Sequence, residues 1–300
     1  MTTALSRGSA DARPRGRAEQ QLSEIAIELL GREVEEAKAA GELGYYARLL
    51  TQATMPHSRS ADLTVTRRNG ALMLRMAALG PGLPYGAVPR LLMAWVTTEA
   101  VRTKQRELVL GDHLAGFMRQ LDLVPTGGRW GTIPRLRSQM VRLFSTAVGV
   151  TFDSPEETSG AGWLVADQYR LWWDPKAPDQ AALWQSTVTL GERFYDMIVE
   201  RPVPVDMRAL KALRRSPLAL DLYTWMTYRY SYLRQPTTIP WEGLMAQFGS
   251  DYRRTIDFRR KAVEALAKVH GIYGEARFDT DTRGLTLRPS PTHVARLKRG

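Results

Sequence analysis

The sequence contains no cysteine and, among 300 residues, only four histidines. Without cysteine the chain has no disulfide, no thiolate nucleophile and no cysteine-ligated zinc or iron–sulfur site. His57, His113, His270 and His293 are scattered, and no two have the spacing that seats a metal or serves a nicking relaxase. We therefore expect no metal, no other cofactor and no enzymatic activity.

Long apolar runs are also missing. No stretch approaches the roughly 18 apolar residues that a membrane-spanning helix needs, and the N-terminus lacks the apolar core of a secretory signal. We expect a cytoplasmic protein without a membrane partner, which the lack of cysteine suits.

The usual signs of catalysis are sparse. The glycine-rich stretch 126–132 lacks the Lys-Ser/Thr ending of a P-loop, so ATP binding is not predicted. Asp153, Glu156 and Glu157 cluster in a polar segment, where solvation is the commoner role of carboxylates. Nothing resembles a nucleophile elbow. A metal-dependent DNA-nicking enzyme is kept only as the weaker alternative.

The composition is that of a globular protein, with 44% apolar and 24% charged residues, and the net charge is strongly basic. The length of the chain predicts about two domains. The net charge of +11 divides into +9 over residues 43–150, −6 over 151–200 and +10 over 201–300. Two basic blocks around an acidic stretch favour a polyanionic partner such as nucleic acid, although solvation better explains any single basic side chain.

Residues 1–54 are expected to form an N-terminal extension. The first 18 are rich in Ser, Gly, Arg and Pro and predict a disordered basic arm. Residues 19–40 have the apolar spacing of an amphipathic helix with a Glu-rich exposed face. This acidic helix is either a partner or dimer helix or a packed accessory helix.

Residues 55–200 predict a first domain. The expected elements are a hairpin of 63–68 with 71–77 across Asn69-Gly70, a helix over 89–103, a strand over 107–110, a helix capped by Asp112, a helix over 132–147 with Thr132 as N-cap, and strands over 148–152 and 163–173 separated by a polar loop. From residue 89 onward the expected order is helix, strand, helix, helix and hairpin, which is the order of elements in a winged helix-turn-helix.

Residues 201–300 predict a second domain with the same order and a basic C-terminal tail. The expected elements are a long helix capped by Asp206 with Pro217 within it, a strand over 237–239, helices over 241–248 and 256–269, and a terminal hairpin of 272–278 with 285–288. The predicted fold class is therefore α+β, mainly helical, with two tandem winged helix-turn-helix domains and a disordered basic N-terminal arm.

One helix in each domain has the side chains that read base edges in a major groove. An ordinary amphipathic surface helix is the alternative for each. The candidate DNA-binding residues of the first domain are Arg129, Trp130, Thr132, Arg135, Gln139 and Arg142. Those of the second are Arg253, Arg254, Arg259, Arg260, Lys261, Glu264, Lys268, Arg277 and Arg283. Glu264 repels phosphate but can accept from cytosine N4, which hints at sequence reading.

Seven stretches occur in order between about Met55 and Pro289: LPYGAVPRLLMAWVTTEA at 83–100, PTGGRWG at 125–131, RLF at 142–144, WWDP at 172–175, RPVPVD at 201–206, SPLALDLYTW at 216–225 and QFG at 247–249. Together they resemble the RepA-type replication initiators of broad-host-range bacterial plasmids. The first 54 residues lie outside this resemblance.

The resemblance implies a non-enzymatic initiator, associated with plasmid DNA in the bacterial cytoplasm. Such a protein binds short direct repeats (iterons) in the double-stranded origin through two winged-helix domains. It helps to open the adjacent AT-rich duplex and recruits the host initiator and the replicative helicase. Related initiators also form homodimers that repress their own promoter. A transcriptional repressor without replication activity is the nearer alternative.

Overall fold

The computed structural model describes residues 43–111, 113–156, 158–172, 178, 185–249 and 252–294. The predicted basic arm, the acidic helix over 19–40 and the C-terminal tail from residue 295 lie outside these residues. The described chain is mixed α/β, with its strands in four small sheets. The expectation of a mainly helical protein therefore holds only in part.

The first unit consists of α4 (Ala87–Thr103), β4 (Glu107–Val109), α5 (Leu114–Gln120), α6 (Thr132–Phe144), β7 (Ala166–Arg170) and β8 (Thr187–Leu190). Its three strands form an antiparallel sheet in the order β4-β8-β7. The side chain that caps α5 is His113, which accepts from Gly116 N, whereas the predicted cap Asp112 lies outside the described residues. Thr132 is the first residue of α6 and not its N-cap, which is Gly131.

The second unit consists of α9 (Pro217–Tyr230), β10 (Thr237–Pro240), α10 (Trp241–Phe248), α11 (Thr255–Ile272), β11 (Phe278–Thr280) and β12 (Gly284–Leu287). Its sheet has the order β10-β12-β11. In both units a helix, a strand and two helices precede the last two strands of a three-stranded sheet, and the final strand lies in its middle. In the first unit, two strands of another sheet, at residues 146–153 and 158–164, come between the second helix and these last two strands. The strand expected to begin at residue 272 begins at Phe278, since α11 continues to Ile272 and residues 273–277 form a turn and coil.

The long helix predicted across Pro217 is two helices. Asp206 caps the short α8 (Met207–Leu213) by accepting from Arg208 N, as predicted. Pro217 is the first residue of α9, and the hydroxyl of Ser216 accepts from Ala219 N at its start. Proline has no N–H to donate within a helix but fits a first turn, where that donor would have no partner.

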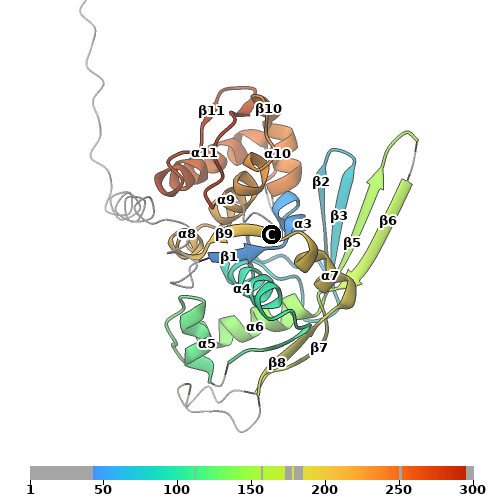
Figure 1. Cartoon of the computed structure of the whole chain (residues 1–300), viewed down its shortest axis with the longest axis vertical. Helices are drawn as coiled ribbons and strands as arrows, with labels where there is room; N and C mark the ends of the chain where they lie inside the picture. Colours follow the sequence, from blue (N-terminus) through green and yellow to red (C-terminus); the bar gives the residue numbers. More distant parts are fainter. Residues whose placement is uncertain are drawn as a thin grey trace, which may run out of the picture.

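A four-stranded sheet projects from the side of the molecule (Figure 1). Its order is β2-β3-β5-β6, formed by β2 (Thr64–Asn69), β3 (Leu72–Ala78), β5 (Thr146–Asp153) and β6 (Thr158–Leu164). The predicted β2–β3 hairpin is confirmed, and Gly70 supplies the left-handed φ of 61° at its turn. The strand after α6 was expected to pair within a wing, but β5 pairs with β3 and β6.

The predicted polar loop 153–162 is largely strand β6. Its sequence TSGAGWL has no apolar alternation, so the pattern gives no strand signal. It becomes a strand because its main chain pairs with β5 from Asp153 to Ala147.

The last residues of the predicted N-terminal extension, from Leu43 onward, are part of the folded protein. The strand β1 (Leu43–Tyr46) pairs antiparallel with β9 (Val203–Asp206), and α3 (Arg48–Gln52) follows it. Tyr46 and Leu50 are buried. The two units lie at opposite ends of the molecule, with β1 and β9 between them (Figure 1).

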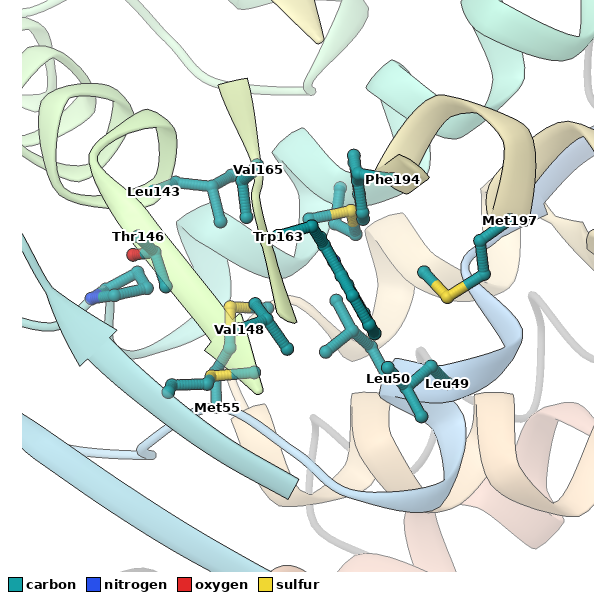
Figure 2. Close-up of a pocket in the computed structure, with 13 residues that line it drawn as sticks. Leu49, Leu50, Met55, Leu143, Thr146, Val148, Trp163, Val165, Phe194 and Met197 are labelled. Carbon is teal, nitrogen blue, oxygen red and sulfur yellow. The ribbon is translucent and has the colours of Figure 1, made fainter. Parts of the chain in front are cut away.

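A single apolar core runs from Tyr46 to Leu287 and so includes both units. One part of it surrounds the indole of Trp163 on β6, between Leu49 and Leu50 of α3 and Phe194 of α7 (Glu192–Glu200) (Figure 2). The cavity that remains there is only about 10 Å³, which is about the space of one water molecule. We interpret it as a packing defect of the core.

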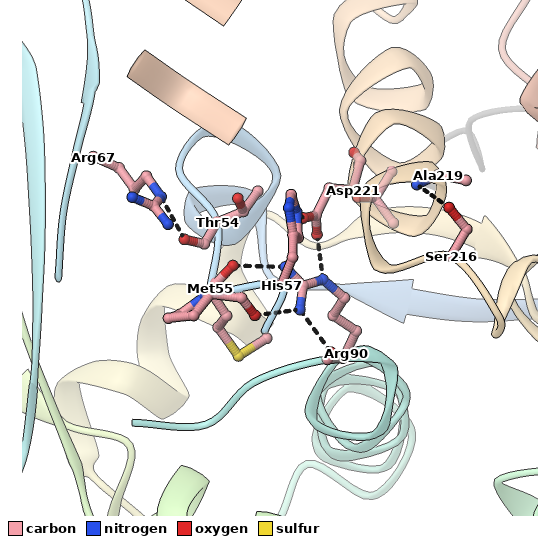
Figure 3. A network of polar contacts seen from close by, with 11 residues as sticks. Thr54, Met55, His57, Arg67, Arg90, Ser216, Ala219 and Asp221 are labelled. Atoms are coloured by element: carbon pink, nitrogen blue, oxygen red, sulfur yellow. Dashed lines mark hydrogen bonds and ion pairs between the residues drawn. The ribbon is translucent and has the colours of Figure 1, made fainter. Parts of the chain in front are cut away.

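A buried polar network joins the two units (Figure 3). Arg90 of α4 and Asp221 of α9 are 1% and 2% exposed and form a bidentate ion pair. The Arg90 guanidinium also donates to the carbonyl oxygens of Met55, Pro56 and Gly86. Nε2 of His57 lies 2.7 Å from the same Asp221 carboxylate. The network connects α4, α9 and the segment after α3.

Candidate nucleic-acid interface

The residues of α6 that are exposed to solvent are not all those predicted, and the exposed face is shifted by about one residue around the helix. Arg135 is exposed as expected, but Gln139 and Arg142 are 2% and 8% exposed. The surface consists of Pro134, Arg135, Arg137, Ser138 and the half-buried Val141. Arg137 was missing from the predicted set, although its spacing of three residues from Pro134 and four from Val141 places it on the same exposed surface. No carboxylate of the described chain forms an ion pair with Arg135 or Arg137.

The prediction that Gln139 and Arg142 face outward is wrong, because both hold the loop that precedes α4. The amide oxygen of Gln139 accepts from Tyr85 N at 2.9 Å. Arg142 donates to Leu83 O at 3.2 Å, and its guanidinium lies 5.6 Å from the centre of the Tyr85 ring. Gly82, at φ 130°, lets the chain pass so close that a Cβ there would lie 2.4 Å from Arg142 Nη1.

The loop before α6 is closed by Thr126 and Thr132. Each threonine accepts at its hydroxyl from the main-chain N–H of the other, and both distances are 2.9 Å. The Thr132 hydroxyl also donates to Val124 O. The sequence predicted Thr132 as a helix cap or DNA contact, and the structure uses it to close this loop. Arg129 and Trp130 lie exposed within it.

On α11 the predicted residues Arg260, Lys261, Glu264 and Lys268 come together, with Arg260, Glu264 and Lys268 exposed and Lys261 partly buried. Nζ of Lys261 donates to Glu264 at 2.8 Å, and Arg260 lies 3.5 Å from the same carboxylate. The hydrogen bond from Lys261 and the surrounding positive charge lower the pKa of Glu264. Glu264 is therefore ionised at neutral pH and holds two of the basic groups.

A groove of about 420 Å³ separates α11 from the N-terminal end of α9. Lys261, Glu264 and Lys268 line one wall, and Arg215 and Ser216 line the other. Sequence reasoning missed Arg215 because it is 46 residues before Lys261 in the chain. Its position next to the Ser-Pro start of a helix is the only local signal.

The remaining predicted cations are exposed or half-buried around the second unit. Arg254 pairs with Asp257 at 2.8 Å, and Arg283 pairs with Asp281 at the turn between β11 and β12. Arg259 lies 5.9 Å from the ring centre of Trp241. Arg253 and Arg277 are exposed, and Arg277 O accepts from Tyr230.

Within the described residues no group of three His, Asp or Glu side chains is placed to hold a metal ion. The same residues include no helix long and apolar enough to cross a membrane.

Comparison with known proteins gives two kinds of match. The chain is similar over 81% of its length to a crystal structure of selenomethionine derivatives of domains 2 and 3 of RctB, at 8% identity, covering 96% of that chain with a TM-score of 0.49. A second structure of RctB domains 2–3 covers 79% of this chain and 94% of its own, at 9% identity and a TM-score of 0.46. The search of curated proteins finds no match.

The second kind of match is to a family model. The model described as plasmid encoded RepA protein matches residues 83–242, more than half of the chain. This range contains α6 and its loop, both members of the Arg90–Asp221 pair and Arg215. The chain therefore belongs to the RepA family of plasmid replication initiators.

Proposed function

We propose that the protein initiates plasmid replication by binding direct repeats in double-stranded origin DNA through two winged helix-turn-helix domains. The observation that carries this is the shared order of the two units, each of which presents a basic helix, α6 or α11, ahead of its last two strands. In this arrangement the second helix of the pair enters the major groove. The proposed domains are residues 55–200 and 201–300, with β1 and α3 packed between them.

The basic side chains divide into two roles. We assign phosphate contacts to Arg129, Arg137, Arg215, Arg253, Arg254, Arg259, Lys268, Arg277 and Arg283, because cations at helix ends, grooves and hairpins position the protein on the duplex. We assign base contacts to Arg135, Arg260, Lys261 and Glu264, which lie on exposed surfaces of α6 and α11 or at their edge. Gln139 and Arg142 are excluded because they are buried.

Glu264 would allow α11 to distinguish a matching base sequence from other sequences. In the free protein its carboxylate binds Lys261 and Arg260. On a matching site it accepts from cytosine N4 and releases these two cations to neighbouring bases. At a non-matching base the carboxylate is repelled by the DNA and gains no hydrogen bond. This cost weakens binding to non-matching sites and so favours the matching sequence.

The rigid connection between the units suits direct repeats. The units occur once each in one chain and share a core and a buried ion pair. One protomer therefore presents two different helices in a fixed order, which matches an asymmetric site repeated head to tail. Recruitment of the host initiator and helicase, repression of its own promoter and homodimer formation follow from the family resemblance and are part of the same proposal.

Gel shifts with repeats taken from beside the gene test the DNA-binding step. We expect affinity at least 1,000-fold above that for scrambled duplex at the same salt concentration. Arg135→Ala and Arg260→Ala are compared with Arg193→Ala, an exposed arginine on α7 in the acidic stretch. Equal binding to repeats and scrambled DNA contradicts the proposal, as does equal loss in all three variants.

Two further measurements separate the alternatives. Supercoiled plasmid incubated with the protein and Mg²⁺ or Mn²⁺ stays supercoiled if the protein acts by binding, and is relaxed or cut by a nicking enzyme. A fragment that carries only the gene and its repeats sustains a plasmid if the protein is an initiator, but not if it is only a repressor.

A further inference from the structure

Trp130 is displayed on the surface in a way that packing does not explain. Its side chain is 85% exposed, more than any other large hydrophobic residue in the described part of the chain. It lies in the loop that leads directly into α6. An indole this exposed contributes little to the core, so its position calls for an external partner.

The loop is built to hold this indole in place. Below the tip, Thr126 and Thr132 exchange two hydrogen bonds, and Ile133 N donates to Thr126 O at 3.2 Å. Gly131 lies so close that a Cβ there would meet the carbonyl oxygen of Thr126 at 2.2 Å. The base of the loop is thus fixed, so the backbone next to Trp130 is already ordered before it binds, which lowers the entropy cost of binding.

The surroundings of Trp130 suit a nucleic-acid base better than a protein surface. The guanidinium of Arg129 lies 5.1 Å from the ring centre. Residues 123–152 include three exposed arginines, Arg129, Arg135 and Arg137, and no Asp or Glu. Trp130 is flanked in the chain by Arg129 and Gly131, and Gly127 and Gly128 precede them without side chains. The other exposed large apolar side chain of this loop is Val124 at its base, so the apolar surface is small for a protein partner. An aromatic face beside cations is the usual platform for a stacked base.

We propose that Trp130 stacks on an unpaired base of origin DNA, with Arg129 on the adjoining phosphate. This rests on the proposed function, since it gives that site a second substrate: the strand released when the duplex beside the repeats opens. In an intact duplex every base already has stacking partners, and separating them costs a few kcal/mol per step. Trp130 therefore binds opened DNA in preference to duplex DNA, and this difference in affinity favours opening.

The full-length protein is titrated with three DNAs: a repeat duplex, the same duplex with an unpaired bubble beside the repeat, and a single-stranded thymidine oligonucleotide of about 20 nucleotides. Trp130→Ala is expected to bind the bubble and the oligonucleotide about tenfold more weakly, with a clearly smaller loss of affinity for the duplex. Trp130→Phe keeps a ring and most of the affinity. Quenching of tryptophan emission by the oligonucleotide is expected in the wild type and much reduced in Trp130→Ala.

The outcomes separate this inference from the proposed function. If Trp130→Ala binds the bubble and the oligonucleotide as the wild type does, or loses duplex affinity equally, the inference is wrong and the proposed function stands. If the wild type fails to select the repeat duplex, the proposed function is wrong, and the oligonucleotide alone decides the stacking site. Loss of plasmid maintenance without any change in DNA binding assigns Trp130 to a protein partner instead. Equal melting temperatures of variant and wild type show that the fold is intact.

Discussion

Arg90 on α4 and Asp221 on α9 form a bidentate ion pair, with Nε donating to Oδ1 at 2.7 Å and Nη2 to Oδ2 at 2.6 Å. The two residues are 131 positions apart and belong to different units. Three main-chain carbonyls and His57 complete the coordination of the pair. The charges are therefore matched within the core, and the units are held in one relative orientation.

Asp221→Asn is expected to lower the free energy of unfolding by about 3–5 kcal/mol, because it leaves the Arg90 charge buried without a counterion. Urea unfolding at pH 7.5 measures this. Asp167→Asn is the matched control, since Asp167 pairs with Arg106 at the surface, and we expect a loss below about 1 kcal/mol. Similar losses in both variants would contradict the role assigned to the buried pair.

Stability is expected to fall as the pH drops below about 6.5, because His57 is buried in its neutral form. Burial lowers the pKa of His57 in the folded protein and outweighs the hydrogen bond to Asp221. The unfolded chain therefore binds a proton at higher pH than the folded one, and protonation favours unfolding once the pH falls through 6.5.

Urea unfolding at pH 7.5 and 5.5 tests this dependence. His57→Gln is expected to reduce the loss of stability between these two pH values. Burial also lowers the pKa of His293, so part of the slope remains in His57→Gln. If the unfolding free energy of His57→Gln changes between pH 7.5 and 5.5 as much as that of the wild type, His57 does not cause the pH dependence.

Two neighbouring positions on α6 are expected to separate stability from DNA binding. Gln139→Ala removes the acceptor of the part-buried N–H of Tyr85, so we expect a loss of about 1–3 kcal/mol in unfolding free energy. Arg135→Ala is expected to leave unfolding unchanged and to weaken binding to the repeats. Thermal melts and gel shifts on the same preparations measure both. The reverse pattern would mean that the exposed face of α6 is misassigned.

The groove between α11 and α9 is expected to bind phosphate. Arg215→Ala and Lys268→Ala should weaken binding to all duplexes similarly and reduce the slope of log affinity against log salt by about one each. Filter binding between 50 and 200 mM salt provides the slope. A loss confined to the specific repeat would place these side chains on bases instead.

Removal of the Glu264 carboxylate is expected to increase nonspecific binding. Glu264→Ala releases Lys261 and Arg260, which then attract any phosphate. Affinity for scrambled duplex should rise while the ratio of specific to nonspecific affinity falls. Competition between repeat and scrambled duplex measures that ratio, and an unchanged value would exclude a reading role for Glu264.

The helices of this protein were largely predictable, because their apolar period and their caps are local. The bounds of α10 agree with the prediction residue for residue, and α4 and α11 agree within a few positions. The strand β6 was not predictable, since small residues carry no period and its pairing with β5 alone makes it a strand. The sequence placed Pro217 inside one long helix, whereas it is the first residue of α9. Apolar periodicity on both sides of a proline does not distinguish a kinked helix from two consecutive helices.

The sequence by itself determined the family, the basic blocks and the two basic helices, because motifs, charge and periodicity are properties of neighbouring residues. Only the tertiary structure decided which side chains on those helices face outward. Gln139 and Arg142 fit a reading face by spacing, but the loop before α4 covers them. Arg215 and Lys261 meet across a groove, and Arg90 meets Asp221 in the core. Such contacts arise from packing between distant segments, which no local pattern specifies.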